Sequence, residues 1–291
     1  TAMRDYIIMT DSCCDLPDAL VRELDITVLP LSFNMEGKEY YNYPDNRDMD
    51  PHVFYDKVRA GVMGTTSAVS VGMFQAKMSS LVETTGKDIL CIAFSSALSA
   101  TYQSASIAAK DVEEAHPGTT VRVVDSRAAS LGQGLLVYLA VQEQRRGRPL
   151  EDTARFVEER RDHLDHWFTV DDLGHLKRGG RIAAAAALFG TMLQMKPVLH
   201  VDNEGRLIPM DKVRGRRASI QALLERMEEL VEDPSLVFIS HGDCLDEAEE
   251  LGRAIKAKYP VQRMVYNHVG PVIGNHTGAG VIALFFVGKH K

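Results

Sequence analysis

The sequence lacks any uninterrupted apolar stretch close to the ~20 residues that cross a bilayer, and no charged-then-apolar segment opens it. Cysteine is scarce, and the four residues Cys13, Cys14, Cys91 and Cys244 match neither a disulfide framework nor a zinc site. A basic excess is also lacking, because the formal net charge is −7, which argues against a general nucleic-acid binder. These absences predict a cytoplasmic protein with no stable membrane insertion, no metal and no nucleic acid among its partners.

What the sequence does contain is typical of a globular protein, with 45% hydrophobic and 25% charged residues. A single hydrophobic core rarely grows beyond roughly 250–300 residues, so a chain of 291 residues favours two domains. The pattern changes after Phe168-Thr169-Val170, where a basic, glycine-rich stretch follows. We therefore predict an N-terminal domain over residues 1–165 and a C-terminal domain over residues 166–291.

Short apolar runs alternate with helical spacing along the first half of the chain. The runs Tyr6–Met9, Thr27–Phe33, Ile89–Phe94 and Val121–Val124 predict strands. Continuous apolar strands, rather than alternating ones, favour a parallel sheet that is covered by helices on both faces. The polar stretch Glu36–Pro51 between them is typical of a surface excursion.

The second half of the chain shows strand and helix patterns as well. Asn203–Arg206 is typical of a hairpin turn, and Leu236–Ser240 predicts a strand. The sequence therefore predicts an α/β fold with two α/β domains, a mainly parallel sheet in the first, and a ligand pocket between or beside the domains. The helices expected over the whole chain are Ser99–Glu114, Ala129–Arg146, Leu150–His163, Ser219–Glu232 and Asp246–Lys258.

Three stretches rich in serine, threonine or histidine adjoin apolar runs: Gly64–Ser67, Phe94–Ser104 and Ile273–Gly280. Residues at strand ends build the ligand sites of α/β proteins, so together these stretches indicate an anion pocket lined mainly by neutral donors. Taken singly, each stretch is more typical of helix caps and turns. Ser12 or Asp15, after the first strand, likewise fits a helix cap.

Several short motifs follow one another along nearly the whole chain. They are Asp11-Ser12-x-x-Asp15, Thr66-Ser67, Ser95-Ser96-x-Leu98-Ser99-x-Thr101-Tyr102-x-Ser104, Asp125-Ser126, Leu176-Lys177-Arg178-Gly179-Gly180-Arg181, Lys196-Pro197 and Gly274-x-His276-x-Gly278-x-Gly280. This order resembles the DegV family. The resemblance implies a two-domain α/β protein that encloses a long-chain fatty acid and, as in several members, serves as the binding component of bacterial fatty acid kinase.

The resemblance also implies which residues bind the ligand, when it is carried over position by position. It assigns the fatty-acid carboxylate to Thr66 and Ser96, with Ser67 and Ser95 beside them and His276 nearby. Arg178 lies in the basic Gly-Gly motif, which the resemblance puts close to the carboxylate and to the partner face. It implies a carrier without catalytic residues or a cofactor, whose partner is an ATP-dependent fatty acid kinase subunit that forms an acyl phosphate.

Other interpretations stay open at this point. Arg214, Arg216 and Arg217 form a basic cluster that either docks an acidic partner or begins a solvated helix. A stand-alone hydrolase or transferase, acting on a lipid or small acid through His276 and serine hydroxyls, is the alternative function, and a lipid sensor is a third. Residues 183–189 either border the acyl chain or form a small apolar helix in the core.

Overall fold

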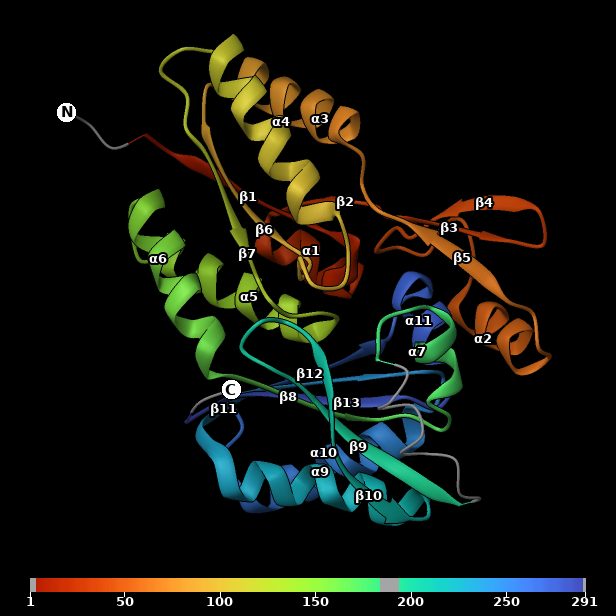
Figure 1. Ribbon diagram of the computed structural model, residues 1–291. Helices are drawn as coiled ribbons and strands as arrows, with labels where there is room; N and C mark the ends of the chain where they lie inside the picture. Colours follow the sequence, from red (N-terminus) through yellow and green to blue (C-terminus); the bar gives the residue numbers. More distant parts are fainter. Residues whose placement is uncertain (1–3, 184–193, 290–291) are drawn as a thin grey trace.

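A four-stranded parallel sheet organises the first half of the molecule (Figure 1). The computed structural model of the protein describes residues 4–183 and 194–289. In spatial order the strands of this sheet are β2 (Thr27–Leu29), β1 (Tyr6–Asp11), β6 (Asp88–Ala93) and β7 (Val121–Asp125). Every neighbouring pair is parallel, which confirms the sheet predicted from the continuous apolar runs.

Helices cover both faces of this sheet, as Figure 1 shows. Ile89 and Cys91 of β6 belong to one apolar cluster, which they share with α3 and α4. Leu90 and Ile92 belong to another, which they share with the helices of the opposite face. Successive side chains of β6 point to opposite faces, so a strand covered on both sides must be apolar throughout. The helices are α1 (Asp18–Leu24), α3 (Val71–Thr85), α4 (Thr101–Ala115), α5 (Leu131–Arg145) and α6 (Leu150–Arg160).

A small antiparallel sheet projects from the parallel one and carries one of the serine and threonine stretches. Its strands, in spatial order, are β4 (Lys38–Tyr41), β3 (Ser32–Met35) and β5 (Gly64–Ser67), and α2 (Pro51–Arg59) connects β4 to β5. The single strand predicted over Thr27–Phe33 is therefore two strands in different sheets. Pro30 lies between them, and proline has no N–H to donate to a continuous ladder.

The strands described after residue 163 form a mixed six-stranded sheet. In spatial order its strands are β10 (Leu207–Arg214), β9 (Met195–Val201), β8 (Leu164–Thr169), β13 (Ile282–Gly288), β11 (Val231–His241) and β12 (Arg263–His268). Only β11 and β12 are parallel, and the predicted hairpin at Asn203–Arg206 joins β9 to β10. The helices of this part are α7 (Gly174–Arg178), α9 (Arg216–Leu230), α10 (Leu245–Lys258) and α11 (Pro271–Thr277).

Helix α5 lies between the two larger sheets, because it packs on β1 and β6 of one and on β8, β11 and β13 of the other. The boundary predicted near residue 165 falls next to the start of β8 at Leu164. Since α5 joins the two sheets in one packed unit, the division into domains 1–165 and 166–291 stays a prediction. Most of the stretch 183–189, expected either to border the ligand or to pack in the core, lies outside the described residues.

Within 4–183 and 194–289, none of the helices combines the length and the apolar composition that crossing a membrane requires.

Candidate functional site

A cavity of about 240 Å³ lies between the carboxyl edge of the parallel sheet and the six-stranded sheet. Segments that follow β6 and precede α5 form one side of it, and β8, β13 and α11 form the other. Such a crevice at the carboxyl ends of parallel strands is where α/β proteins bind ligands. The expected pocket between or beside the two parts of the fold is thus present.

Most of the cavity wall is apolar. Aliphatic and aromatic side chains from both sheets reach it, and nearly all of them are buried in the protein. Such a surface favours a ligand with a long hydrocarbon portion, because each apolar contact removes water from both partners. The apolar lining includes Leu31, Phe94, Leu98, Phe168, Leu176, Leu207, Val269, Val272, Ile273 and Val281.

Polar side chains gather where β5 and α11 meet the cavity. Thr66 and Ser67 of β5 line it together with His276 of α11 and Arg181. The Thr66 hydroxyl and His276 Nε2 are hydrogen-bonded at 2.8 Å, although the residues are 210 positions apart in the chain. The register of β5 places Thr66 opposite the buried Phe33 of β3. This pairing fixes the position of the Thr66 hydroxyl at the cavity.

His276 is held in its uncharged form by its surroundings. Burial, assisted by the positive charge of Arg181, lowers the pKa of the imidazole to about 4. Its second nitrogen, Nδ1, is buried without a hydrogen-bond partner among the residues that the structure describes. The ring packs directly on Gly179, where the Cβ of any other residue would overlap Nδ1. The glycine in the basic motif is therefore required by the close approach of the imidazole.

A second, basic depression adjoins the cavity on its outer side. Thr66, Arg181 and His276 line both spaces and so form the wall between them. Arg178 lines only the outer depression, where it is exposed and its guanidinium bonds His175 Nδ1 at 3.1 Å. A carboxylate held at this wall would thus lie at the end of an apolar cavity and beside a positively charged surface.

Two of the serines that the resemblance assigned to the carboxylate lie elsewhere. Ser95 is buried, and its hydroxyl donates to the carbonyl of Gly205 in the β9–β10 hairpin at 2.8 Å. Ser96 is exposed, and its backbone N–H donates to Asp125 at 3.2 Å. Neither lines the cavity. Their carboxylate contacts stay predictions, and the geometry favours Thr66 and Ser67 over them.

Two features of the cavity were missed by sequence reasoning. Arg181 lies in the same basic motif as Arg178, and only the fold shows that Arg181, rather than Arg178, reaches the cavity. Ser130 also lines the cavity, and its hydroxyl donates to Asp15 Oδ2 at 2.6 Å. Burial raises the pKa of Asp15, and the hydrogen bond from Ser130 lowers it by less. The pKa of this carboxyl is therefore about 7.

Asp15 caps the C-terminal end of the short turn Ser12–Cys14, where its N–H donates to the Ser12 carbonyl at 3.2 Å, whereas Ser12 caps no helix and neither residue caps the start of α1. Asp11 caps the short helical turn Ser12–Cys14 by accepting from the Cys13 N–H at 3.0 Å. Ser12 instead accepts from the Leu31 N–H at 2.9 Å, which joins the first turn to the segment between β2 and β3.

The three arginines predicted to dock a partner differ in their surroundings. Arg214 and Arg217 are exposed. Arg216 is half-buried at the start of α9, where it pairs with Asp171 and Glu247, each at 3.0 Å. Arg214 and Arg217 are therefore available to a partner, whereas Arg216 links α9 to Asp171 and to Glu247 of α10.

A family model described as "Uncharacterised protein, DegV family" matches residues 6–289. The chain belongs to the DegV family. The resemblance to this family that the motifs indicated is thereby confirmed.

Relatives of this DegV-family chain match it over almost its full length. A DegV domain-containing protein of Clostridium perfringens is 43% identical, and the match covers 99% of each chain. A Thermus thermophilus structure, described as fatty acid binding of a DegV family protein, is 33% identical with a TM-score of 0.86, covering 97% and 99% of the two chains. DegV of Bacillus subtilis, described as a fatty acid binding protein, is 29% identical with a TM-score of 0.84, covering 99% and 100%.

Proposed function

We propose that this protein binds a long-chain fatty acid in the cavity and presents the carboxylate to a separate ATP-dependent kinase. The observation that carries the proposal is an apolar cavity that ends at Thr66, Ser67 and His276 and adjoins a basic outer depression. Two structural relatives over 25% identical are described as binding fatty acids. The protein acts in this proposal as the binding component, and the partner performs the chemistry.

Neutral donors would hold the carboxylate. If His276 is protonated at Nε2, it donates to the Thr66 oxygen and leaves the Thr66 hydroxyl hydrogen free for the ligand. Ser67 offers a second hydroxyl from the same strand, and Arg181 adds a positive charge at the wall. A buried carboxylate needs such bonds to offset the loss of its hydration.

The hydrocarbon chain would supply most of the affinity. About fifteen buried methylenes contribute roughly 12 kcal/mol gross at ~0.8 kcal/mol each, before the entropy of association and reorganisation are subtracted. Each hydrogen bond to the charged head group would add about 1.5–3 kcal/mol, much less than the chain as a whole, and would also orient the carboxylate for transfer. We therefore expect changes at Thr66 to affect phosphorylation more than lipid retention.

Phosphoryl transfer would take place at the outer depression. A carboxylate oxygen attacks the γ-phosphorus of ATP, the bond to the β-phosphate oxygen breaks, and ADP leaves while the acyl phosphate stays bound. The kinase would supply ATP and magnesium, and its need for ATP favours a cytoplasmic location. Arg178, Arg214 and Arg217 offer the kinase exposed positive charges.

A stand-alone hydrolase is supported less well by the same geometry. A histidine with a pKa of about 4 is a weak general base at neutral pH. The hydroxyl beside it belongs to Thr66, whereas the Ser95 hydroxyl donates to a backbone carbonyl. A lipid sensor would keep the same cavity but would recruit its partner without phosphorylation.

A reconstituted phosphorylation assay tests the proposal. Delipidated protein, oleic acid, ATP and a bacterial fatty acid kinase subunit should yield acyl phosphate, which hydroxylamine traps as the hydroxamate. Omitting this protein should abolish the product. Acyl phosphate formed without the kinase would favour a stand-alone transferase, fatty acid released from a lipid ester by this protein alone would favour the hydrolase, and ligand-dependent association without product would favour the sensor.

A further inference from the structure

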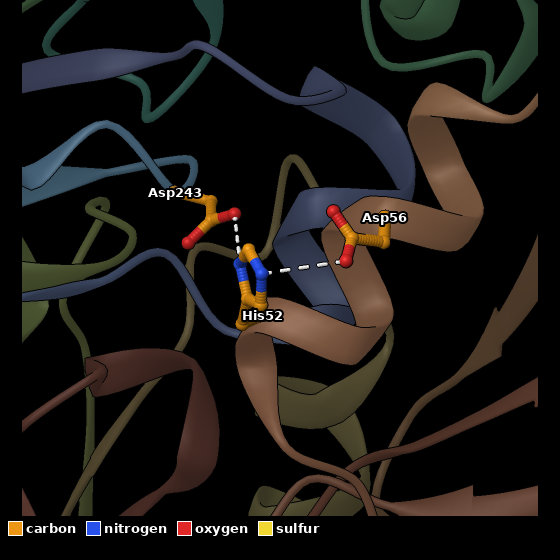
Figure 2. Close-up of side chains that lie close together, drawn as sticks. All are labelled: His52, Asp56 and Asp243. Carbon is orange, nitrogen blue, oxygen red and sulfur yellow. Dashed lines mark hydrogen bonds and ion pairs between the residues drawn. The ribbon is translucent and has the colours of Figure 1, made fainter.

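Three side chains meet on the surface where α2 faces the loop between β11 and α10, outside the cavity. Figure 2 shows the His52 ring between Asp243 and Asp56. His52 Nδ1 lies 2.7 Å from Asp243 Oδ2, and Nε2 lies 3.4 Å from Asp56 Oδ2. These residues have the donor types of a metal site. However, the ring directs one nitrogen at each carboxylate, which is the arrangement of a protonated imidazole bridging two anions.

Arg59 adds a second positive charge to the same group. Its Nη1 lies 2.7 Å from Asp243 Oδ2 and 3.2 Å from Asp56 Oδ1, and its Nη2 donates to the Asp243 carbonyl at 2.9 Å. The guanidinium therefore pairs with both carboxylates and adds a second positive charge beside the imidazole. His52 lies in the first turn of α2 and Arg59 in the last, so one aspartate holds both ends of this helix.

Asp243 has a left-handed backbone conformation and a largely buried side chain. Its φ is 62°, in the left-handed region where a non-glycine residue is uncommon. The side chain is only 15% exposed. Burial would raise the pKa of this carboxyl, but hydrogen bonds from Arg59, His52 and His268 outweigh burial and lower it to about 2. Asp243 is therefore ionised throughout the physiological range.

Helix α2 connects this cluster to the cavity. Tyr55, in the middle of α2, donates to the carbonyl of Val269 at 2.5 Å. The same side chain leaves no room for a Cβ at Gly274 of α11, because that atom would lie 2.7 Å from the Tyr55 hydroxyl. Helix α2 also leads directly into β5, which carries Thr66, and α11 carries His276. The position of α2 thus affects where Thr66 and His276, the two partners of the hydrogen bond, are placed.

We propose that Asp243 is a positioning residue: with His52 and Arg59 it forms a clamp that fixes α2 and so keeps Thr66 within hydrogen-bond distance of His276. We call Asp243, His52 and Arg59 the α2 clamp. Its effect on ligand affinity rests on the proposed function, since it acts through the carboxylate end of the cavity. The clamp itself depends only on the contacts above and can be tested without a ligand.

The clamp should weaken at alkaline pH. The hydrogen bond to Asp243, together with the charges of Asp243 and Asp56, raises the pKa of His52 above its ordinary value of about 6.5. His52 therefore strengthens the clamp fully below pH 6.5 and ceases to do so as the pH rises through its raised pKa. Other charged or titratable groups face the same surface: Asp171, Lys196, Arg216, Cys244, Glu247 and His268, with the His241 ring tilted against that of His268 at a centroid distance of 4.5 Å.

Hydrogen–deuterium exchange of the ligand-free protein at pH 6.5 tests the clamp. Asp243→Asn removes the charge, and asparagine tolerates the same left-handed backbone. We expect faster exchange over residues 51–67 and 271–277 in this variant. Arg216→Gln is the matched control, because it removes two neighbouring ion pairs that do not involve α2. Equal exchange in Asp243→Asn and wild type would overturn the proposal.

The effect on the site is measured with a fluorescent polyene fatty acid. The dissociation constant of Asp243→Asn should rise about three- to thirtyfold, the range for residues that modulate a site without touching its ligand. Wild-type affinity should fall between pH 6.5 and 8.5, and the fall should be smaller in His52→Gln, a change at a largely exposed side chain, while Asp15, with a pKa of about 7, titrates in both proteins. A slope unchanged in His52→Gln would contradict the clamp. So would a melting temperature that Zn²⁺ raises in wild type but not in His52→Gln, because the cluster would then bind metal. A wild type that takes up no fatty acid refutes the proposed function, while the exchange result still decides the clamp.

Discussion

Replacing Thr66 with valine separates recognition of the carboxylate from burial of the hydrocarbon chain. Valine has nearly the shape of threonine, so β5 and its pairing with β3 should persist. The change removes one hydroxyl from the wall of the cavity and leaves His276 Nε2 without its 2.8 Å partner. A hydrogen bond to a charged group contributes about 1.5–3 kcal/mol, which corresponds to about a 13- to 160-fold weaker affinity for the fatty acid.

A fatty alcohol of the same length provides the comparison. It buries the same methylenes but carries no charge, so Thr66→Val should weaken its binding only about 2- to 10-fold. Competition against a fluorescent fatty acid measures both ligands under one set of conditions. Thr65→Val is the matched control, because Thr65 is exposed on the same strand and does not line the cavity. Equal losses for acid and alcohol would refute the assignment of Thr66 to the carboxylate.

Three further predictions concern the surroundings of the site. Gly179→Ala should displace the His276 ring, because the added methyl group overlaps it, and should lower fatty-acid affinity several-fold in the same competition assay. Gly72→Ala is the control and should leave the affinity unchanged, because the nearest atom to its added methyl group is 4.0 Å away. As the pH falls from about 7 to 5, wild type should lose about 2 kcal/mol more unfolding free energy in urea titrations than His276→Gln does. The reason is that the imidazole gains a proton in the unfolded chain but not in the folded protein, where its pKa is about 4. Equal losses in the two proteins would contradict this pKa. Reversing charge at the exposed Arg214 and Arg217 should weaken kinase binding at low salt without changing lipid content, and unchanged binding would make these side chains a solvated face.

The parallel sheet could be predicted because its strands are apolar throughout. β6 is buried along its whole length between two helical layers, so its sequence carries a signal that depends little on the rest of the fold. β5 could not be predicted in this way, because Gly64–Ser67 has no apolar residue. It is a strand only because it pairs with β3, where Phe33 lies opposite Thr66 and 33 positions earlier in the chain, and such pairing is not visible in local spacing.

Within the candidate site, too, some residues could be predicted from the sequence and others only from the fold. Thr66 and His276 were reached through the family resemblance, and the fold brings them into contact across the chain. Local sequence cannot distinguish Ser95 and Ser96 from Ser67, because all three lie in similar polar stretches. Their environments differ only in three dimensions, where Ser95 meets the β9–β10 hairpin and Ser67 meets the cavity.

The α2 clamp was also beyond sequence reasoning. Its members lie 191 positions apart for His52 and Asp243, and 184 apart for Arg59 and Asp243. Charged residues in loops and helix ends are ordinarily solvated, so no local pattern singles out these three. Their significance follows from the packing of α2 against α11, which only the folded chain shows.

Native mass spectrometry of the purified protein, followed by denaturation and identification of any released lipid, tests the central claim most directly. The account predicts one long-chain fatty acid per chain, either carried through purification or taken up when oleic acid is added to the delipidated protein. A protein that is empty and stays empty with added fatty acids would contradict it.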